Sequence, residues 1–428
     1  MIFDLVGIGA GPFNLSLGIL LKDTKLKSLF LDKKTDFFWH SGMKLKFATI
    51  QNSNLKDLVS LVKPTSEYSF FNFLYETGRL ESHIIANFSF TLRWEYEQYL
   101  QWVISKLDTV RMGNEVKLIK ECEEGFEIIL KTDSQKPIFA KNISVALGVK
   151  PLIPEFLENN LSERIFHNSE YQFHSKKGAK NILIVGGGQS ALEIIIDLFN
   201  DKNNDIESIT MVYREPFTHQ MEDSQFAEDK IYTEMGLSNF YKLPSELKEN
   251  LNKQYRFASD GASPHTIEEV YQMLYANRYS KIGKQIKFNI YSECSVCDVT
   301  ETDKDLDIKV AIENIYSKNQ KIISADMIIL ATGYKQYFPK EIFSDEILSK
   351  IKKDNNYNVC ISEDYSLKYE GKGKIFYLNG GKHTHGVVDP NLSLNASRAR
   401  KIVLSLDKTF PKPVKQDTIF GGIIWYIF

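Results

Sequence analysis

Cysteine is scarce in this chain of 428 residues, which contains four. Cys122 and Cys360 stand alone, and Cys294 and Cys297 form a single CxxC pair. A disulfide framework is not expected, and the cysteine usage fits a reducing cytoplasm. The CxxC pair lacks a second pair and a nearby histidine, which favours strand packing over zinc binding or redox work. No other group has the spacing of metal ligands, so no metal site is expected.

Long apolar runs and an excess of charge are also missing. The 55 acidic and 53 basic residues give a net charge of -2, so no nucleic-acid partner is expected. A strand pattern begins directly at Met1, which leaves no room for a signal peptide. The apolar run 421–428 is too short to cross a bilayer, so no transmembrane segment is expected. We interpret the tail 416–428 as a docking segment on the protein's own surface or on a partner subunit.

Two strand–glycine loop–helix–strand patterns are present. The first has a strand at 2–9 (IFDLVGIG), a helix at 14–21 and a strand at 27–32. The second begins with NILIVGGGQSALEIIIDLF from Asn181 and continues into a strand at 209–213. The length of the chain suits two or three domains. The patterns predict an α/β fold with two Rossmann-like dinucleotide-binding domains.

The order of the remaining segments indicates that the second domain is inserted into the first. Antiparallel strands are expected within 116–143, and a late strand (DMIILATGY, 326–334) again arrives at a glycine. The first dinucleotide-binding domain is expected at 1–175 and 325–415, and the second at 176–214 and 281–324. Residues 215–280 are expected to form a mostly helical substrate-proximal region, and 416–428 the apolar tail.

The first glycine loop contains Gly7, Gly9 and Gly11, followed by Pro12 at the predicted start of the helix. Glycine allows backbone N–H groups at a helix N-terminus to approach a pyrophosphate, and proline suits a first helical position. Asp32 ends the next strand, where a carboxylate can accept the hydroxyls of a ribose. These residues predict a dinucleotide site.

The second glycine loop contains Gly186 and Gly188, with Ala191 allowing close helix packing. Arg214 follows the next strand, at the place where an NAD site would carry an acid. A guanidinium there can pair with a 2′-phosphate, which favours NADPH over NADH. A surface arginine beside Glu215 is the alternative.

Two dinucleotides in one chain point to flavin chemistry, with NADPH as hydride donor and FAD as acceptor. Flavin reductases, disulfide oxidoreductases and monooxygenases share this organisation. A disulfide reductase would need a redox cysteine pair near the flavin, and 294–297 is poorly placed for that role. A monooxygenase needs neither a catalytic cysteine nor a metal.

Seven segments, among them the two glycine loops, follow one another along nearly the whole chain. They are GIGAGPFNLSL (7–17), FFWHSGMKL (37–45), LKDLVSLVKPTSEYSFFNFL (55–74), GGGQSALE (186–193), ASDGASPHTIEEVYQMLY (258–275), ATGY (331–334) and HGVVDPNLSL (385–394). In these segments the chain closely resembles the siderophore-associated N-hydroxylating flavin monooxygenases, the lysine and ornithine N-monooxygenase family. The resemblance implies FAD, NADPH and O2, with a C4a-hydroperoxyflavin that hydroxylates a small primary amine.

The resemblance also implies roles for individual residues, while the catalytic chemistry stays with the flavin. Residues implied to bind substrate are Gln51, Lys56, Glu228 and Ser393. Residues implied to contact a cofactor, besides the glycine loops, are Trp39, His40, Met43, Gln51, Arg93, Gln189, Ser190, Gly333, Tyr334, Asp389 and Leu392. His40 is expected to pack on the cofactor and not to act as a general base. Relatives of this type are often tetramers, so a homo-oligomer, a tetramer or dimer, is expected.

One departure from the family pattern bears on the substrate. Amino-acid hydroxylases of the family carry F-x-N-E, whose asparagine holds the α-amino and carboxylate end. Here the segment is FAED, with Glu228 at the asparagine position. An added carboxylate repels an amino-acid carboxylate, which favours histamine or a diamine such as putrescine or cadaverine. The alternatives are an L-lysine N6-monooxygenase, a pyridine-nucleotide flavin reductase without oxygenation, and a solvent-exposed Glu228 with no role.

Overall fold

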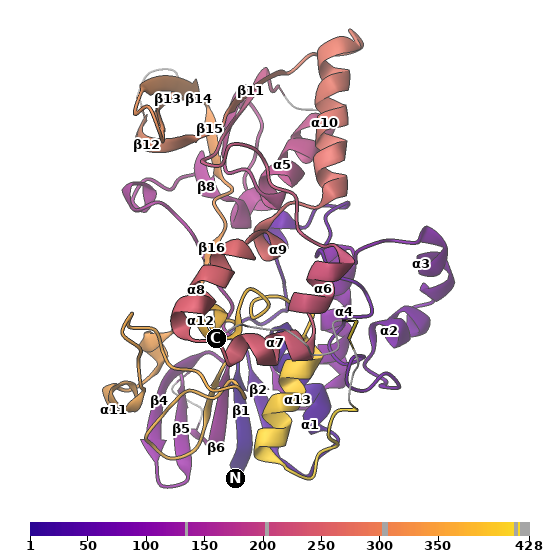
Figure 1. Ribbon diagram of the computed structural model, residues 1–428, viewed down its shortest axis with the longest axis vertical. Helices are drawn as coiled ribbons and strands as arrows, with labels where there is room; N and C mark the ends of the chain where they lie inside the picture. The colour runs from indigo at the N-terminus through magenta and orange to yellow at the C-terminus, as the bar shows by residue number, and fades with distance from the viewer. Residues whose placement is uncertain (133–135, 202–204, 302–306, 415–417, 420–428) are drawn as a thin grey trace.

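The computed structural model describes residues 1–132, 136–201, 205–301, 307–414 and 418–419. A seven-stranded sheet forms the base of the molecule (Figure 1). Its strands run in the order β3-β2-β1-β6-β5-β4, and β17 also pairs with β6. Their bounds are β1 Ile2–Ile8, β2 Ser28–Leu31, β3 Val110–Arg111, β4 Val116–Cys122, β5 Gly125–Leu130, β6 Ile138–Val145 and β17 Ile375–Tyr377.

Helix α1 (Pro12–Leu21) connects β1 to β2, and those two strands pair in parallel. Every residue of α1 is buried, which is why its sequence is apolar on all sides and lacks a polar stripe. Helix α13 (Asn395–Leu406) packs against α1. Strand β6 is parallel to β1 and antiparallel to β5, as expected for a chain that enters the sheet through a meander.

A second sheet of five strands lies above the first (Figure 1). Its order is β11-β10-β9-β15-β8, and every pairing is parallel. The bounds are β8 Ile165–His167, β9 Asn181–Val185, β10 Ser208–Val212, β11 Lys287–Tyr291 and β15 Met327–Leu330. Helix α5 (Gln189–Asn200) connects β9 to β10. The predicted fold class is confirmed, with two dinucleotide-type sheets in one chain.

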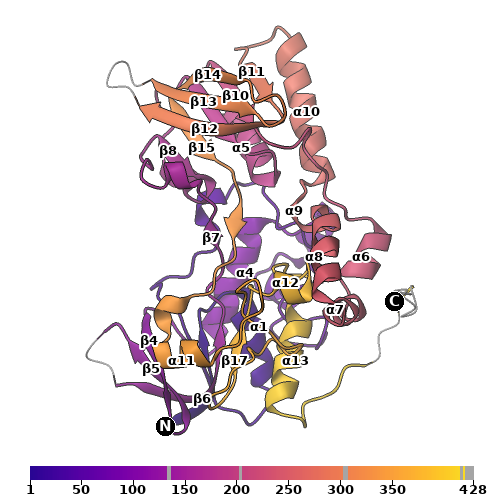
Figure 2. The ribbon, with the colours of Figure 1, turned by 60° about the vertical axis from the view of Figure 1, so that its left-hand side comes forward.

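The two sheets are joined by two chain segments that lie side by side. Strand β7 (Lys150–Pro151) leaves the first sheet after β6, and β16 (Tyr334–Lys335) returns after β15. The two pair as an antiparallel ladder, and Leu152 N–H donates to Gly333 O at 2.9 Å. The second domain is therefore inserted into the first, and β7 and β16 form a two-stranded connection at the waist of the molecule in Figure 2.

The strand pairing corrects the predicted bounds of the first domain. Residues 165–167 and 327–330 were assigned to that domain, but β8 and β15 pair with each other in the second sheet. An apolar strand that reaches a glycine is typical of either sheet, so the pattern does not identify the partner strand. The connection β7–β16 marks the passage between the domains.

A small antiparallel sheet covers one side of the second domain (Figure 2). It consists of β12 (Cys294–Glu301), β13 (Ile308–Asn314) and β14 (Gln320–Ala325). Cys294 is buried in its core and Cys297 is exposed, with its thiol directed to Ala311 O at 3.3 Å. The CxxC pair is part of a strand, as its isolation in the sequence indicates.

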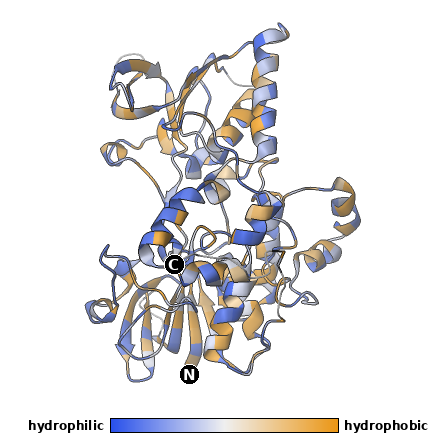
Figure 3. Cartoon of the chain, in the orientation of Figure 1, coloured by the Kyte–Doolittle hydropathy of each residue, from blue (hydrophilic) through white to orange (hydrophobic). Residues whose placement is uncertain are grey.

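Helices α6 to α9 lie between the two sheets, and α10 stands beside the second sheet (Figure 1). Their bounds are α6 Gln225–Ile231, α7 Glu234–Tyr241, α8 Ser245–Gln254, α9 Phe257–Asp260 and α10 Pro264–Tyr279. Helix α8 is mostly hydrophilic along its length (Figure 3), and Leu251 is its one buried residue. Helices α7 and α8 pack against α12 (Lys382–His385) of the first domain.

Helix α10 departs from the predicted helical region. Val270 is buried in the same core cluster as Ile194 of α5, so α10 packs as an element of the second domain. The sequence shows its helical pattern but not which neighbour its apolar face covers. The predicted region 215–280 therefore divides between the two domains.

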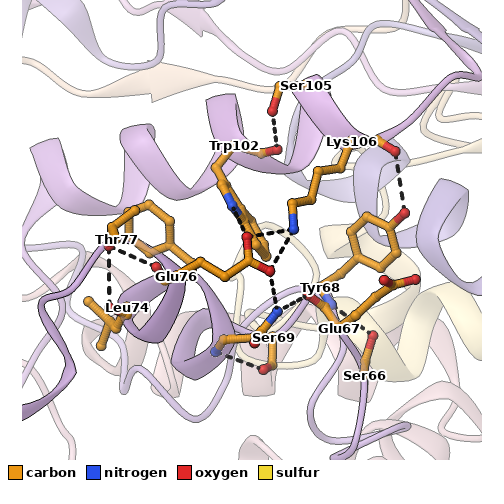
Figure 4. Close-up of polar contacts among 12 residues, drawn as sticks. Ser66, Glu67, Tyr68, Ser69, Leu74, Glu76, Thr77, Trp102, Ser105 and Lys106 are labelled. Carbon is orange, nitrogen blue, oxygen red and sulfur yellow. Dashed lines mark hydrogen bonds and ion pairs between the residues drawn. The ribbon is translucent and has the colours of Figure 1, made fainter.

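Helices α2 (Phe70–Glu76), α3 (Leu80–Ala86) and α4 (Arg93–Lys106) cover the side of the first domain. Figure 4 shows the polar contacts that join α2 to α4. Lys106 Nζ lies 2.7 and 2.6 Å from the two carboxylate oxygens of Glu76, and Trp102 Nε1 donates to the same carboxylate at 3.2 Å. Tyr68 OH donates to Lys106 O at 3.3 Å. These contacts fix α4, whose N-terminus faces the second domain.

The remaining elements are short. They are α11 (Asp345–Lys350) and the 3-10 turns η1 (Ser41–Met43), η2 (Glu155–Leu157), η3 (Asn168–Phe173) and η4 (Lys340–Ile342). Across the described residues no helix has both the length and the apolar character needed to span a membrane. Of the predicted C-terminal docking segment, residues 416, 417 and 420–428 lie outside the described residues.

The turns η1 and η3 bring the two domains into backbone contact. A Cβ added at Gly42 would stand 1.8 Å from Ser169 O and 2.7 Å from Glu170 N. Both neighbours are backbone atoms, so a side chain at this position would separate η1 from η3. Only glycine fits between the two turns.

Replacing Gly42 with alanine is expected to destabilise the protein by about 1–3 kcal/mol, because the added methyl group has no space. Thermal unfolding of Gly42→Ala measures the effect. Ser41→Ala is the control, since it alters the same turn without adding an atom at the contact. Equal melting temperatures for Gly42→Ala and the wild type would contradict the close approach.

Candidate active site

The first glycine loop connects the carboxyl end of β1 to α1. Gly9 has φ +92°, and a Cβ there would lie 2.5 Å from Ala146 O. A Cβ on Gly7 would likewise collide with the ring of Phe30 at 2.2 Å. Gly11 is the N-cap of α1, with Pro12 as the first helical residue, and no atom lies within 4 Å of its ideal Cβ. Glycines at 7 and 9 are required by the fold, whereas Gly11 borders open space at a helix N-terminus.

This open helix N-terminus suits the pyrophosphate of a dinucleotide. Asp32, just after β2, lies beside it, and its carboxylate accepts Ala10 N–H at 2.8 Å and Lys34 N–H at 3.0 Å. Asp389 is fully buried, and its Oδ1 has no hydrogen-bond partner among the described residues. The same oxygen lies 3.9 Å from Arg398 Nη2. An open helix N-terminus and a buried carboxylate oxygen without a hydrogen bond fit a ligand that brings hydrogen-bond donors, as FAD would.

Burial raises the pKa of Asp389, against the lowering effect of the nearby Arg398 guanidinium. The other carboxylate oxygen of Asp389 accepts Gly381 N–H at 2.8 Å. Leu392, three residues further on, is partly buried against the main core of the first domain. Both residues belong to the loop between α12 and α13.

The second glycine loop repeats the arrangement between β9 and α5. Gly186 has φ +138°, and a Cβ there would lie 2.1 Å from Ala331 O. Gly188 is the N-cap of α5, and the nearest atom to its ideal Cβ is 4.0 Å away. Ser190, in the first turn of α5, is half-buried. Arg214 is exposed two residues after the end of β10, where a 2′-phosphate could reach it.

Gln189, implied to contact a cofactor, is engaged with other side chains. Its Nε2 donates to Glu193 Oε1 at 3.1 Å and to Thr266 Oγ1 at 3.0 Å. Its Oε1 accepts Ser263 N–H at 2.8 Å. Gln189 therefore ties the start of α5 to the start of α10.

Aromatic rings from both domains meet at the interface. The rings of Trp39 and His40 are 4.4 Å apart, and Tyr334 lies 6.3 Å from His40 and 5.1 Å from His167. Gly333, with φ +83°, accepts a hydrogen bond from His167 Nε2 at 2.9 Å. The structure thus brings Tyr334 near Trp39 and His40, which lie almost 300 positions earlier in the sequence.

His40 adopts a left-handed conformation with φ +53°. Such a backbone is uncommon outside glycine and clusters at functional sites. The His40 side chain is partly exposed, but the protein atoms around the ring replace much of the water that would stabilise its charged form. The positive charges of Arg93 and Lys34 disfavour the charged form further. These effects lower the pKa of His40 to about 3, so the ring is neutral at neutral pH. A neutral ring fits the expected packing role.

Gln51 is the second strained residue of this region, with φ +51°. Its Nε2 donates to Ser263 Oγ at 3.0 Å and to Gly261 O at 3.2 Å. Met43 is buried in the core of the second domain, although it belongs to η1 of the first. Both residues connect the domains.

Arg93 uses its terminal nitrogens within the protein. Nη1 donates to Met43 O at 2.6 Å, and Nη2 donates to Thr49 O at 3.0 Å. Each also donates to one oxygen of Glu193 at 3.0 Å. Four acceptors occupy the four Nη hydrogens, which leaves only Nε–H for a ligand.

Lys56 and Glu228 form an ion pair across the helical region. Lys56 belongs to the loop before α2, Glu228 to α6, and 172 positions separate them in the chain. The ammonium also lies 5.7 Å from the ring centre of Tyr232. Both partners remain partly exposed, at 25% for Lys56 and 36% for Glu228, so a small molecule can reach them.

Ser393 contacts the loop that carries Lys56. It is buried, and its hydroxyl lies 3.1 Å from Asn52 Oδ1 and 2.6 Å from Asn391 Oδ1. Asn52 in turn donates to Lys56 O at 3.0 Å. Ser393 therefore supports the Lys56 loop through Asn52. Asn52 was not among the residues predicted from the sequence, where its one signal is its place four residues before Lys56.

Comparisons with known proteins agree with this geometry. The family model described as L-lysine 6-monooxygenase/L-ornithine 5-monooxygenase matches residues 1–336. A putrescine N-hydroxylase of Shewanella oneidensis is 30% identical, over 98% of this chain and 84% of its own. An L-lysine N6-monooxygenase of Escherichia coli is 28% identical, over 94% and 93%. The FAD-bound cadaverine monooxygenase of desferrioxamine biosynthesis from Erwinia amylovora superposes with a TM-score of 0.90, at 26% identity and 98% coverage of each chain.

The fold and the two glycine loops, taken with these matches, identify an FAD- and NADPH-dependent flavin monooxygenase that hydroxylates the nitrogen of an amine. The chain belongs to the L-lysine 6-monooxygenase/L-ornithine 5-monooxygenase family.

Gly11→Ala tests whether the open space at α1 receives a ligand. Gly11 has φ -76°, which alanine adopts without strain, so the free energy of unfolding of the FAD-free protein should change by less than about 0.5 kcal/mol. FAD binding should weaken roughly tenfold or more, because the methyl group stands where backbone N–H groups would meet the pyrophosphate. Fluorescence titration with FAD measures this, and wild-type affinity would contradict the assignment.

His385 provides a pH prediction. It is fully buried and its ring stacks on Tyr365 at 4.2 Å. Desolvation, aided by Lys401 and Arg398, lowers its pKa from 6.5 to about 3. Between these pH values the unfolded chain binds a proton that the folded protein does not, so His385 makes stability fall as the pH drops below 6.5.

His385→Phe keeps an aromatic ring and removes the titration. Between pH 6.5 and about pH 5 the variant should lose about 2 kcal/mol less stability than the wild type. Urea unfolding at both pH values provides the comparison. Parallel losses in the two proteins would show that His385 accepts its proton in the folded state.

Proposed function

We propose that this enzyme hydroxylates a small primary amine without an α-carboxylate, giving a hydroxylamine for hydroxamate-type siderophore biosynthesis. The favoured substrates are aliphatic diamines such as putrescine or cadaverine, and histamine. The observation that carries the proposal is the Lys56–Glu228 ion pair at the partly exposed edge of the site. O2 is the co-substrate, and the working assembly is a homo-oligomer.

The ion pair determines what the far end of a substrate meets. Lys56 has the charge to hold a carboxylate, but Glu228 already neutralises it. An amino-acid carboxylate would have to break this pair and then lie beside the carboxylate of Glu228, which is unfavourable. The distal ammonium of a diamine can instead share Glu228. An imidazole N–H of histamine can donate to the same carboxylate.

The remaining site residues would hold and shield the reaction. Bound FAD, reduced by NADPH, supplies the activation of O2. The first glycine loop and Asp32 would hold FAD, and the second glycine loop and Arg214 would hold NADPH. Trp39 and the neutral His40 would cover the cofactor edge and limit access of water. Asn52 and Ser393 keep Lys56 in position.

The relatives support this assignment in part. One relative is named for putrescine and a structural relative for cadaverine, and neither of these diamines has a carboxylate. The lysine-named relative from Escherichia coli makes an L-lysine N6-monooxygenase the principal alternative. Flavin reduction without oxygenation is the alternative of another class.

Product analysis separates these functions. The purified enzyme is incubated with NADPH and a single amine, and hydroxylamine formation is compared with NADPH consumption. Hydroxylamine that accumulates from a diamine or histamine supports the proposal. NADPH consumption with peroxide and no hydroxylamine from any amine would instead support the reductase.

Glu228→Gln is expected to shift the substrate preference. Removing the carboxylate frees Lys56 to bind a substrate carboxylate, so the ratio of kcat/KM for L-lysine to kcat/KM for the best diamine should rise roughly tenfold or more. Asp229→Asn is the matched control, because it makes the same change of charge at the next residue of α6. An unchanged ratio in Glu228→Gln would remove Glu228 from substrate selection.

A further inference from the structure

The two-stranded connection leaves the second domain free to rotate unless other contacts hold it. Strands β7 and β16 are two residues long each, and the other covalent crossings are the segment between β10 and α6 and the junction of α9 and α10. Short paired connections of this kind are suited to hinge motion, because a few residues can absorb the change in backbone angles. The relative position of the domains therefore depends on side-chain contacts elsewhere in the interface.

The strongest of these contacts is the Arg93–Glu193 ion pair. Arg93 is the first residue of α4 in the first domain, and Glu193 lies in the first half of α5 in the second. The pair is bidentate at 3.0 Å for both bonds, and the side chains are 11% and 1% exposed. A bidentate arginine–carboxylate pair fixes distance and orientation together.

Helix energetics alone do not explain an arginine at this place. A cation at a helix N-terminus opposes the helix dipole, which favours anions there. Glu193 supplies the compensating negative charge from the other domain. Loss of either partner would leave a desolvated charge without its counter-ion, so the two residues stabilise each other only while the domains stay in register.

The pair is connected to further hydrogen bonds in both domains. On the second domain, Glu193 accepts from Gln189, and Gln189 binds Thr266 and Ser263 at the start of α10. On the first domain, the bonds of Arg93 to Met43 O and Thr49 O hold the segment 43–49. That segment supplies Met43, Leu45 and Ala48 to the core of the second domain.

A second set of hydrogen bonds also joins the two domains. The Nε2 group of Gln51 donates to Ser263 Oγ and Gly261 O, from a residue held at φ +51°. The network therefore joins the Arg93–Glu193 pair and the Gln51 contacts at one point, the junction of α9 and α10. Gly42 against Ser169 closes the same interface on its other side.

We propose that Arg93 and Glu193 are positioning residues that lock the angle between the two dinucleotide domains. The locked angle sets the distance over which hydride passes, with both its electrons, from NADPH to the flavin, leaving NADP+. The part that concerns hydride transfer rests on the proposed function, whereas the fixed angle does not. A misplacement of the reacting groups by about 1 Å can cost roughly 100-fold in rate.

The test measures the domain angle and the reduction rate separately. Spin labels are placed on exposed positions of the FAD-loaded full chain, by Lys120→Cys in β4 and Tyr275→Cys in α10, after the native cysteines are replaced. Pulsed electron resonance gives the distance distribution between the domains. Anaerobic stopped-flow mixing with NADPH gives the limiting rate of flavin reduction, and dithionite reduces the flavin independently of the second domain.

Glu193→Gln should broaden or shift the distance distribution and lower the limiting reduction rate by NADPH roughly 10- to 100-fold. Reduction by dithionite should be unchanged. Glu95→Gln is the matched control, since Glu95 is a buried carboxylate in the first turn of α4 that pairs with His83 at 3.2 Å within the first domain. Glu95→Gln should leave the distance distribution and the reduction rate as in the wild type.

A wild-type distance distribution in Glu193→Gln would overturn the proposal, whatever the reduction rate. A changed distribution with a wild-type reduction rate would overturn its catalytic half. If Glu193→Gln does not fold, Arg93→Lys serves in its place, because lysine keeps the charge and loses the bidentate geometry. Failure of the proposed amine hydroxylation would leave the distance measurement unaffected, so the two outcomes are distinguishable.

Discussion

The Arg93–Glu193 ion pair is the contact that we propose fixes the angle between the two domains. Two dinucleotide domains are joined by short connections, among them one pair of two-residue strands, and reactions between their cofactors require a fixed separation. A bidentate ion pair, almost wholly buried, supplies direction as well as attraction. Glycine at position 42 allows the backbones of the two domains to approach closely beside it. The interface is therefore built for one geometry.

The candidate site lies where this interface meets the helical region. The first domain contributes Lys56 and the loop that Asn52 and Ser393 support, and α6 contributes Glu228. None of these residues has to carry the oxygen chemistry, which belongs to the flavin. On the proposed function, their contribution is to choose and hold the amine. In this proposal, the carboxylate paired with the lysine is a small change that alters which amine the site favours.

The sequence predicted the parts that local patterns encode. Glycine loops, their helices and the acid after β2 follow one another within about 30 residues, so Gly9, Gly11 and Asp32 could be assigned from spacing. Contacts between distant segments could not be assigned in this way. Arg93 and Glu193 are 100 positions apart, and Lys56 and Glu228 are 172 apart. The strands β8 and β15 were placed in the wrong sheet for the same reason, because an apolar strand does not specify its neighbour.

The central functional claim is that the site selects amines without a carboxylate, and competition tests it most directly. The enzyme is given equal concentrations of putrescine, cadaverine, histamine, L-lysine and L-ornithine with NADPH and air, and each hydroxylamine is quantified by mass spectrometry. The account predicts that products of the carboxylate-free amines exceed those of the two amino acids by roughly tenfold or more. A mixture dominated by N6-hydroxylysine or N5-hydroxyornithine would contradict it.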